Sequence, residues 1–126
     1  MTHKVLIVDD SKLARMAVLR VLKTLHADWT SSEAANAEQA LASVRDESPD
    51  FVLLDFNMPG KDGLALAAEL RQMNPRLNIA LISANHQIEV ITRAQAVGAT
   101  FLRKPLTETA LAEFFGGASA SGKANA

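Results

Sequence analysis

The sequence predicts an α/β fold in which one five-stranded parallel sheet is covered by helices on both faces. Two observations support this prediction. Three short apolar runs, at residues 5–8, 51–54 and 79–82, contain no alternating polar residues, which is typical of strands buried on both faces. Segments with helical spacing of apolar residues separate these runs, and alternating strands and helices form right-handed βαβ units.

Each strand is expected to be followed by a helix along the whole chain. Two weaker apolar segments, at 29–32 and 100–103, bring the predicted strands to five. Helices are predicted at residues 11–26, 38–44, 64–73, 87–97 and 107–115. In the first helix one apolar stripe with helical spacing should face the core; its members are Ala14, Ala17, Val18, Val21, Leu22 and Leu25.

The composition limits the class of protein. The chain has 126 residues, no cysteine and a net charge of −1, so disulfides and thiolate metal sites are excluded and no nucleic-acid-binding surface is indicated. No apolar stretch reaches the roughly 20 residues of a membrane span, and none resembles a signal peptide. We expect a soluble cytoplasmic domain at residues 1–115, and a disordered tail or linker at 116–126, where only small and polar residues occur.

Polar residues follow four of the predicted strands directly. Asp9 and Asp10 follow the first strand, Asp55 the third, Ser83 the fourth and Lys104 the fifth. Taken singly, each could be a helix cap, turn residue or solvated charge. Because ligands of open parallel sheets bind at the carboxyl ends of the strands, we interpret the five together as one site.

The chemistry of this set is specific. Three carboxylates in one shallow cleft repel one another and favour a hard divalent cation. Mg²⁺ suits such a site, because it uses few protein ligands and shares phosphate oxygens. Lys104 and Ser83 could face a phosphoryl group there, and Asp55 would be the nucleophile that forms an acyl phosphate.

Four segments, VLIVDDS, LLDFNMPGKDG, ALISA and VGATFLRKP, stand in an order and spacing that resemble the receiver domain of bacterial two-component response regulators, from residue 4 to about 115. The length is similar to that of stand-alone, chemotaxis-type regulators. The resemblance implies a flavodoxin-like, doubly wound (βα)5 fold with strand order 2-1-3-4-5.

The resemblance also implies roles for individual residues. Asp55 would be the phospho-acceptor, and Mg²⁺ would be held directly by Asp10, mainly through water by Asp9, and by Asp55 and the main-chain carbonyl of Asn57. Lys104 would contact the phosphoryl group and form a cis bond to Pro105. Ser83 and Phe101 match the switch positions, although Phe101 could equally be a plain core residue. Asn85 lies where the family tunes hydrolysis of the phosphate. The protein would not be an enzyme beyond slow self-dephosphorylation.

The expected partners are proteins. The resemblance implies a histidine kinase or histidine phosphotransfer protein as donor and an unknown downstream protein target, with no direct contact to nucleic acid or membrane. Output, or homodimerisation, would use the face of the fourth helix, fifth strand and fifth helix, which includes Glu89, Val90, Arg93, Ala94, Phe101, Arg103, Ala112 and Phe115.

The first helix suggests a second contact surface. Leu13, Met16 and Leu19 point away from the predicted core stripe, and exposed apolar residues beside the active edge could dock a helix of the donor. Surface leucines are also ordinary.

Two other functions compete with this interpretation, and a third possibility concerns only the boundaries of the chain. The chain could be a receiver cut from a hybrid kinase or a DNA-binding regulator. A non-phosphorylated pseudo-receiver usually lacks an acidic or lysine position, and none is missing here. An aspartyl-phosphate phosphatase would need an aspartate where Asn57 stands, and a cap domain.

Overall fold

The computed structural model describes residues 3–58, 62–84 and 87–124, and for residues 117–124 the backbone alone. Five strands alternate with five helices in these segments. In chain order they are β1 (Lys4–Val8), α1 (Lys12–Leu25), β2 (Thr30–Ala34), α2 (Ala37–Glu47), β3 (Phe51–Asp55), α3 (Gly63–Met73), β4 (Asn78–Ser83), α4 (Ile88–Ala96), β5 (Ala99–Arg103) and α5 (Glu108–Ala124).

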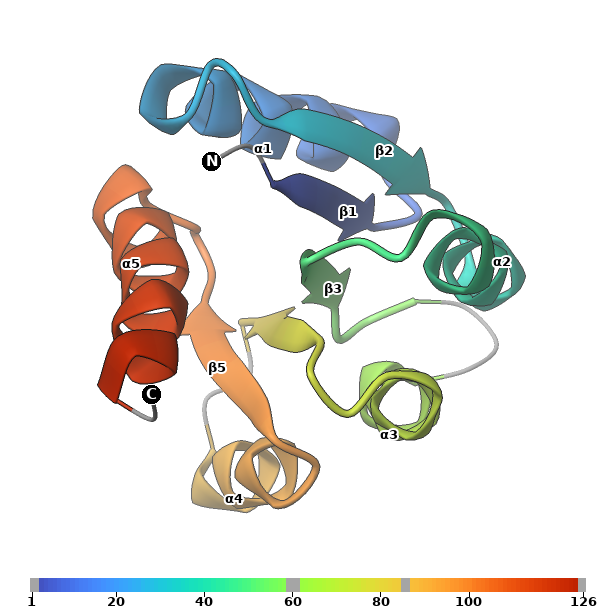
Figure 1. Cartoon of the computed structure of the whole chain (residues 1–126). Helices are drawn as coiled ribbons and strands as arrows, with labels where there is room; N and C mark the ends of the chain where they lie inside the picture. The colour runs from blue at the N-terminus through green and yellow to red at the C-terminus, as the bar shows by residue number, and fades with distance from the viewer. Residues whose placement is uncertain (1–2, 59–61, 85–86, 125–126) are drawn as a thin grey trace.

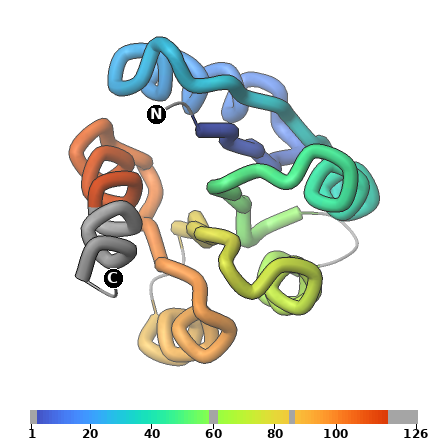
Figure 2. The backbone as a smooth tube through the Cα atoms, in the orientation of Figure 1, coloured from blue at the N-terminus to red at the C-terminus, as the bar shows by residue number. Residues whose placement is uncertain are grey.

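The strands form one parallel sheet in the order β2-β1-β3-β4-β5, which confirms the predicted fold class. Helices α1 and α5 lie on one face of the sheet, and α2, α3 and α4 lie on the other (Figure 1). Figure 2 traces the chain as it winds between these two layers. The strand order places β1 and β3 side by side at the centre, so the residues that follow them meet at one edge.

The sheet separates two apolar cores. One core lies under α2, α3 and α4 and includes Leu54, Leu66 and Leu81. The other lies under α1 and α5 and includes Leu53 and Leu111. Because the side chains of a strand alternate between faces, adjacent residues of β3 such as Leu53 and Leu54 enter different cores. This explains the unbroken apolar run in the sequence.

Helix α1 only partly matches the predicted stripe. Leu22 is buried and Val18, Val21 and Leu25 pack against the core, as predicted. Ala17 is exposed, which corrects the prediction for that position. The helix turns about 100° per residue, so the stripe drifts and Ala17 lies at its rim. Ser11 caps the helix, since its hydroxyl accepts a hydrogen bond from the Ala14 N–H at 3.2 Å.

The last helix is longer than the sequence predicts. Helix α5 runs to Ala124, whereas the predicted helix ends at residue 115 and is followed by a disordered tail or linker. The segment after Gly116 contains no proline and its alanines have the highest helix propensity, whereas Gly117 and Gly122 each disfavour a helix by about 1 kcal/mol. The domain boundary at residue 115 stays a prediction.

Aromatic rings fill the end of the sheet at which the strands begin. Trp29 stacks on His26 at 3.7 Å between ring centroids and on Phe51 at 5.4 Å, and it meets Phe115 edge-on at 5.1 Å. Trp29 thus packs among aromatic rings, and β2 begins at Thr30, one residue after the start of the segment predicted at 29–32. No helix among the described residues is long and apolar enough to cross a membrane.

Gly63 allows α3 to begin directly beneath the end of β3. A Cβ atom at this position would lie 2.8 Å from the Cα of Phe56 and 3.0 Å from the main-chain oxygen of Asp55. Backbone atoms cannot move aside as the end of a flexible side chain can, so only glycine permits this approach. The first residue of α3 is therefore held directly against the backbone of Asp55 and Phe56.

We expect Gly63→Ala to lower the free energy of unfolding by about 1–3 kcal/mol, because the added methyl group overpacks the junction of β3 and α3. Urea denaturation measures this change. Gly116→Ala is the matched control: a Cβ there would meet no described atom within 4 Å, and alanine favours a helix by about 1 kcal/mol. Equal stability of Gly63→Ala and wild type would contradict the packing argument.

Candidate functional site

Three aspartates converge where β1 and β3 end. Asp9 and Asp10 follow β1, and Asp55 is the last residue of β3. One carboxylate oxygen from each lies within 4.8 Å of the others. Asp55 is buried at 4% exposure, Asp9 is half-buried and Asp10 is exposed. The structure thus brings together the acidic residues that the sequence predicts, with Asp55 at the base of the cleft.

Lys104 supplies the positive charge of the site. Its Nζ lies 2.9 Å from Oδ1 of Asp55, and its main-chain N–H donates to the carbonyl of Ser83 at 3.0 Å. Ser83 itself is fully buried at the end of β4. The Lys104–Pro105 bond is cis, as predicted. Strands β3, β4 and β5 therefore deliver a carboxylate, a hydroxyl and an ammonium to the same edge.

Two hydrogen bonds hold Asp9 in place, although burial and the nearby Asp55 disfavour its ionised carboxylate. Its Oδ1 accepts a hydrogen bond from the Ser11 N–H at 2.9 Å, and its own N–H donates to the Ala34 carbonyl at 3.1 Å. Burial raises the pKa of the Asp9 carboxyl above its ordinary value, and the negative charge of Asp55 adds to this rise. The hydrogen bond from Ser11 opposes the rise only in part.

The donor set fits a hard divalent cation. Three carboxylates with mutually close oxygens and an opening on the exposed Asp10 side offer the oxygen ligands that Mg²⁺ prefers, and they leave room for water or phosphate. Asn57 is exposed, and its N–H donates to Oδ1 of Asp55 at 3.4 Å; its carbonyl as a metal ligand stays a prediction. Asn85 lies outside the described residues.

An ion pair beside the site was not predicted. Arg15 of α1 donates from Nε to Oε1 of Glu33 in β2 at 2.8 Å, and from Nη1 to the main-chain carbonyl of Asp9. A sequence signal existed, because Arg15 interrupts an apolar helix face next to Ala14 and Glu33 is the charged residue of a short strand. Neither signal gives the partner, since the pairing depends on how α1 crosses β2.

The predicted contact surface on α1 is partly confirmed. Leu13 and Met16 are exposed at 78% and 45%. Leu19 is half-buried against the core under α1 and α5, so the prediction that it is exposed on this surface is wrong. The apolar stripe of α1 is wider than the spacing of its predicted members suggests. Beside these residues an apolar groove of about 630 Å³ runs from α1 to the loop after β5, lined by Asp9, Ala14, Ala17, Val18, Val21, Ile82, Ala84, Lys104, Pro105 and Leu106.

The predicted output face also needs correction. Arg93 and Arg103 are exposed, as expected, and Phe101 is half-buried. Val90 is buried at 8%, and Ala94 and Phe115 are buried as well, because they are the residues with which α4 and α5 pack on the domain. Those three cannot contact a partner, and the exposed part of the face is narrower than predicted.

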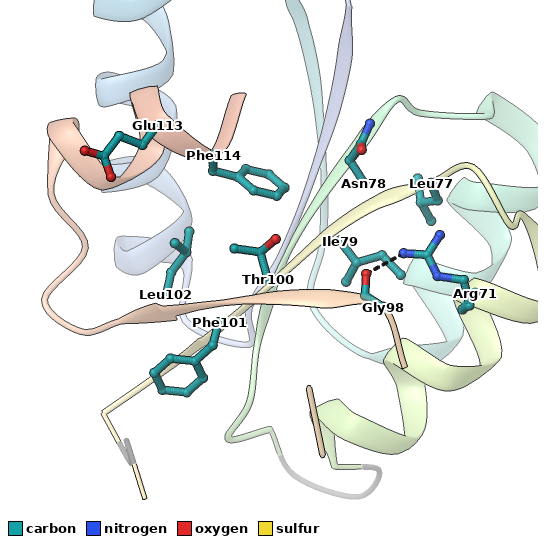
Figure 3. A pocket seen from close by; sticks show the side chains of 10 residues that line it. All are labelled: Arg71, Leu77, Asn78, Ile79, Gly98, Thr100, Phe101, Leu102, Glu113 and Phe114. Atoms are coloured by element: carbon teal, nitrogen blue, oxygen red, sulfur yellow. Dashed lines mark hydrogen bonds between the residues drawn. The ribbon is translucent and has the colours of Figure 1, made fainter. Parts of the chain in front are cut away.

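A separate hollow of about 460 Å³ lies against β5 (Figure 3). The side chain of Phe101 extends to the opposite side of the strand from those of Thr100 and Leu102 (Figure 3). Arg71 of α3 donates to the Gly98 carbonyl at 2.8 Å and the Val97 carbonyl at 3.2 Å, so the beginning of β5 is tied to α3. Residues at the beginnings of β4 and β5 line this hollow, at the opposite end of the sheet from the aspartates.

Comparisons with known proteins agree with this geometry. The family model described as the response regulator receiver domain matches residues 5–115. The chain is 35% identical over 106 residues to the chemotaxis protein CheY of Bacillus subtilis, covering 83% of this chain and 88% of that protein. It is 32% identical to sporulation initiation phosphotransferase F of the same organism, covering 83% and 84%.

Solved structures show the same fold. The structure of CheY4 of Vibrio cholerae superposes with a TM-score of 0.82 at 29% identity, covering 91% of this chain and 97% of that one. A CheY-like receiver domain from Methanospirillum hungatei gives a TM-score of 0.89 at 20% identity over the full length of both chains. Other relatives are longer: the match covers 21% of the transcriptional regulator NtrC of Salmonella typhimurium.

We expect Asp9→Asn to raise the thermal midpoint of the metal-free protein at neutral pH by about 2–4 °C, because the amide removes a buried charge and its repulsion from Asp55. The pKa of Asp9 is raised in the folded state, so its ionised form costs stability above that pKa. The advantage of the variant should therefore shrink as the pH falls through the raised pKa, where the wild-type carboxyl becomes protonated. Calorimetry in EDTA across this range measures the difference.

Addition of Mg²⁺ should stabilise the wild type and leave Asp9→Asn almost unchanged, because a ligand that binds the folded state alone raises its stability. A variant that is less stable than wild type at every pH would contradict the repulsion argument.

Proposed function

The chain belongs to the response regulator receiver family, and from that premise we propose that Asp55 accepts a phosphoryl group from a phosphohistidine of a histidine kinase or histidine phosphotransfer protein. The observation that carries this proposal is the contact of 2.9 Å between the buried Asp55 carboxylate and Lys104, within a cluster of three aspartates. Receivers act in signalling together with kinases and phosphotransfer proteins.

The reaction is a phosphoryl transfer between two side chains. An Asp55 carboxylate oxygen attacks the phosphorus atom, a P–O bond forms and the P–N bond to the donor histidine breaks. The histidine nitrogen keeps the electron pair of that bond, and the ring leaves as neutral imidazole because its second nitrogen is protonated in the phosphohistidine that reacts. Lys104 balances negative charge on the phosphoryl oxygens. Ser83, at the end of the adjacent strand, would bind one of these oxygens.

Asp9, Asp10 and Asp55, together with the main-chain carbonyl of Asn57, would hold Mg²⁺. When bound, this ion supplies positive charge next to the phosphoryl oxygens. The three carboxylates would orient it, and Asp55 would keep one oxygen free for the attack. The electrostatic repulsion between Asp9 and Asp55 supports the assignment of these residues as metal ligands, because a bound cation would relieve it.

The product is a signal rather than a released metabolite. Receiver domains are signalling proteins, and we propose that this one catalyses no more than slow loss of its own phosphate to water. Ser83 and Phe101 would transmit the modified state to the exposed part of the face formed by α4, β5 and α5, where Arg93 and Arg103 lie. A downstream protein, or a second copy of the chain, would bind there.

The receiver chemistry fits both a stand-alone protein and one domain of a longer regulator. We propose a cytoplasmic protein whose receiver domain spans residues 1–115. Some relatives carry the receiver as a fraction of a longer regulator, so the same chemistry would also serve a receiver taken from a hybrid kinase or a DNA-binding regulator. Neither arrangement requires direct contact of this domain with nucleic acid or a membrane.

The donor would dock on α1 beside the active edge. Leu13 and Met16 are exposed there, and the apolar groove next to them reaches Lys104. Helix α1 carries four basic and no acidic residues, of which Lys12, Arg20 and Lys23 are exposed. These features suit a donor helix with apolar residues flanked by acidic ones.

We expect one phosphoryl adduct on the wild type after incubation with Mg²⁺ and acetyl phosphate, and none on Asp55→Asn, because asparagine lacks the nucleophilic oxygen. Intact-protein mass spectrometry measures the adduct, and EDTA should abolish it. An adduct that survives Asp55→Asn would assign the reaction to another residue. No adduct on either protein, with a phosphorylated donor protein also inactive, would favour a non-phosphorylated interaction module.

We expect Met16→Asp to slow phosphotransfer from a donor protein at least about 10-fold, because a charge would replace an apolar contact and repel acidic residues of the donor. Labelling by acetyl phosphate should be unchanged. Met73→Asp is the matched control, since Met73 is similarly exposed, at 43%, but lies at the far end of α3. Equal losses with both kinds of donor would refute the docking surface.

A further inference from the structure

Arg15 connects three parts of the active edge. It lies in α1, and its side chain is 13% exposed. One nitrogen, Nη1, donates to the main-chain carbonyl of Asp9. Another, Nε, lies 2.8 Å from Oε1 of Glu33 in β2. The guanidinium thereby joins the loop that follows β1 to the neighbouring strand.

These bonds determine the course of the chain through the two aspartates that follow β1. The Asp9 N–H donates to the Ala34 carbonyl at 3.1 Å, so β2 holds this residue on its amino side. Arg15 holds it on the other side, because the carbonyl that it binds belongs to the peptide unit joining Asp9 to Asp10. Since that unit is planar, fixing its oxygen also fixes the amide from which Asp10 continues.

We propose that Arg15, oriented by Glu33, is a positioning residue that holds Asp9 and Asp10 in the arrangement that binds the divalent cation. The inference rests on the proposed function, because it concerns the same metal site. A guanidinium is a rigid planar fork that can donate to two acceptors at once, whereas the lysine ammonium is a point charge on a flexible stem. Lysine should therefore replace the charge of Arg15 but not its geometry.

The charge and the geometry of Arg15 act on the cation in opposite directions. A positive side chain near the site repels Mg²⁺, so removal of its charge alone would tighten binding. Loss of the bond to the Asp9 carbonyl would weaken binding, because the ligands would have to be ordered when the metal arrives. If the variant that lacks the charge binds Mg²⁺ more weakly, Arg15 positions the ligands; if it binds Mg²⁺ more tightly, the main effect of Arg15 is electrostatic repulsion.

The test is calorimetric titration with Mg²⁺ at fixed pH and ionic strength, which needs no phosphoryl donor. We expect the Kd to rise about 10-fold in Arg15→Met, as for other residues that orient metal ligands, and at least as much in Arg15→Lys, which keeps the charge that repels Mg²⁺ but loses the planar fork. Glu33→Gln should weaken binding least, since the glutamine oxygen can still accept from Arg15. Arg20→Met removes an exposed charge from the same helix and should leave the Kd within about twofold.

Urea denaturation in EDTA accompanies each titration and identifies variants that do not fold; if Arg15→Met is among them, Arg15→Lys carries the test. Weaker Mg²⁺ binding by a folded Arg15 variant supports the proposal. Unchanged or tighter Mg²⁺ binding by such a variant overturns the proposal. A variant that is less stable in EDTA but keeps the wild-type Kd also overturns it, because Arg15 would then have a structural role alone. A wild type that binds no Mg²⁺ would instead refute the metal site of the proposed function, and this inference with it.

Discussion

Repulsion among three aspartate carboxylates is the constraint on which the rest of the active edge depends. Their nearest oxygens lie within 4.8 Å of one another, and the pKa of Asp9 is raised by burial and by the charge of Asp55. Such a cluster persists because neighbouring groups hold it in place. Lys104 pairs with the most buried member, the Ser11 N–H donates to Asp9, and the strand ends fix where each chain emerges.

The parallel sheet places the three repelling carboxylates together at one edge. Parallel strands order their carboxyl ends along one edge, and the central strands β1 and β3 deliver the acidic residues there. The close approach at Gly63 keeps α3 against the backbone of Asp55 and Phe56 at the end of β3. This close packing keeps the carboxylates near one another. A cation bound between them would remove their repulsion, and its binding would be more favourable by that free energy.

The sequence predicts most of this architecture because the fold and the site use the same signals. Unbroken apolar runs mark buried strands, and the polar residue after each run marks the edge at which strands end. Val90 and Leu19 were misplaced for a physical reason: periodicity gives the angle of a residue around its helix but not how deeply neighbouring helices cover it. The pair of Arg15 and Glu33 was missed because it depends on the crossing of α1 over β2, which spacing does not encode.

Lys104 links the chemical centre to the surfaces around it. The ammonium contacts Asp55, while the same residue lines the apolar groove beside α1 together with Pro105 and Leu106. Its main-chain N–H is bonded to the carbonyl of Ser83, in the neighbouring strand. A phosphoryl group on Asp55 would place new oxygens in competition for the ammonium. Because one side chain serves both places, a change of charge on Asp55 would act on the wall of the groove without requiring a separate relay through the core.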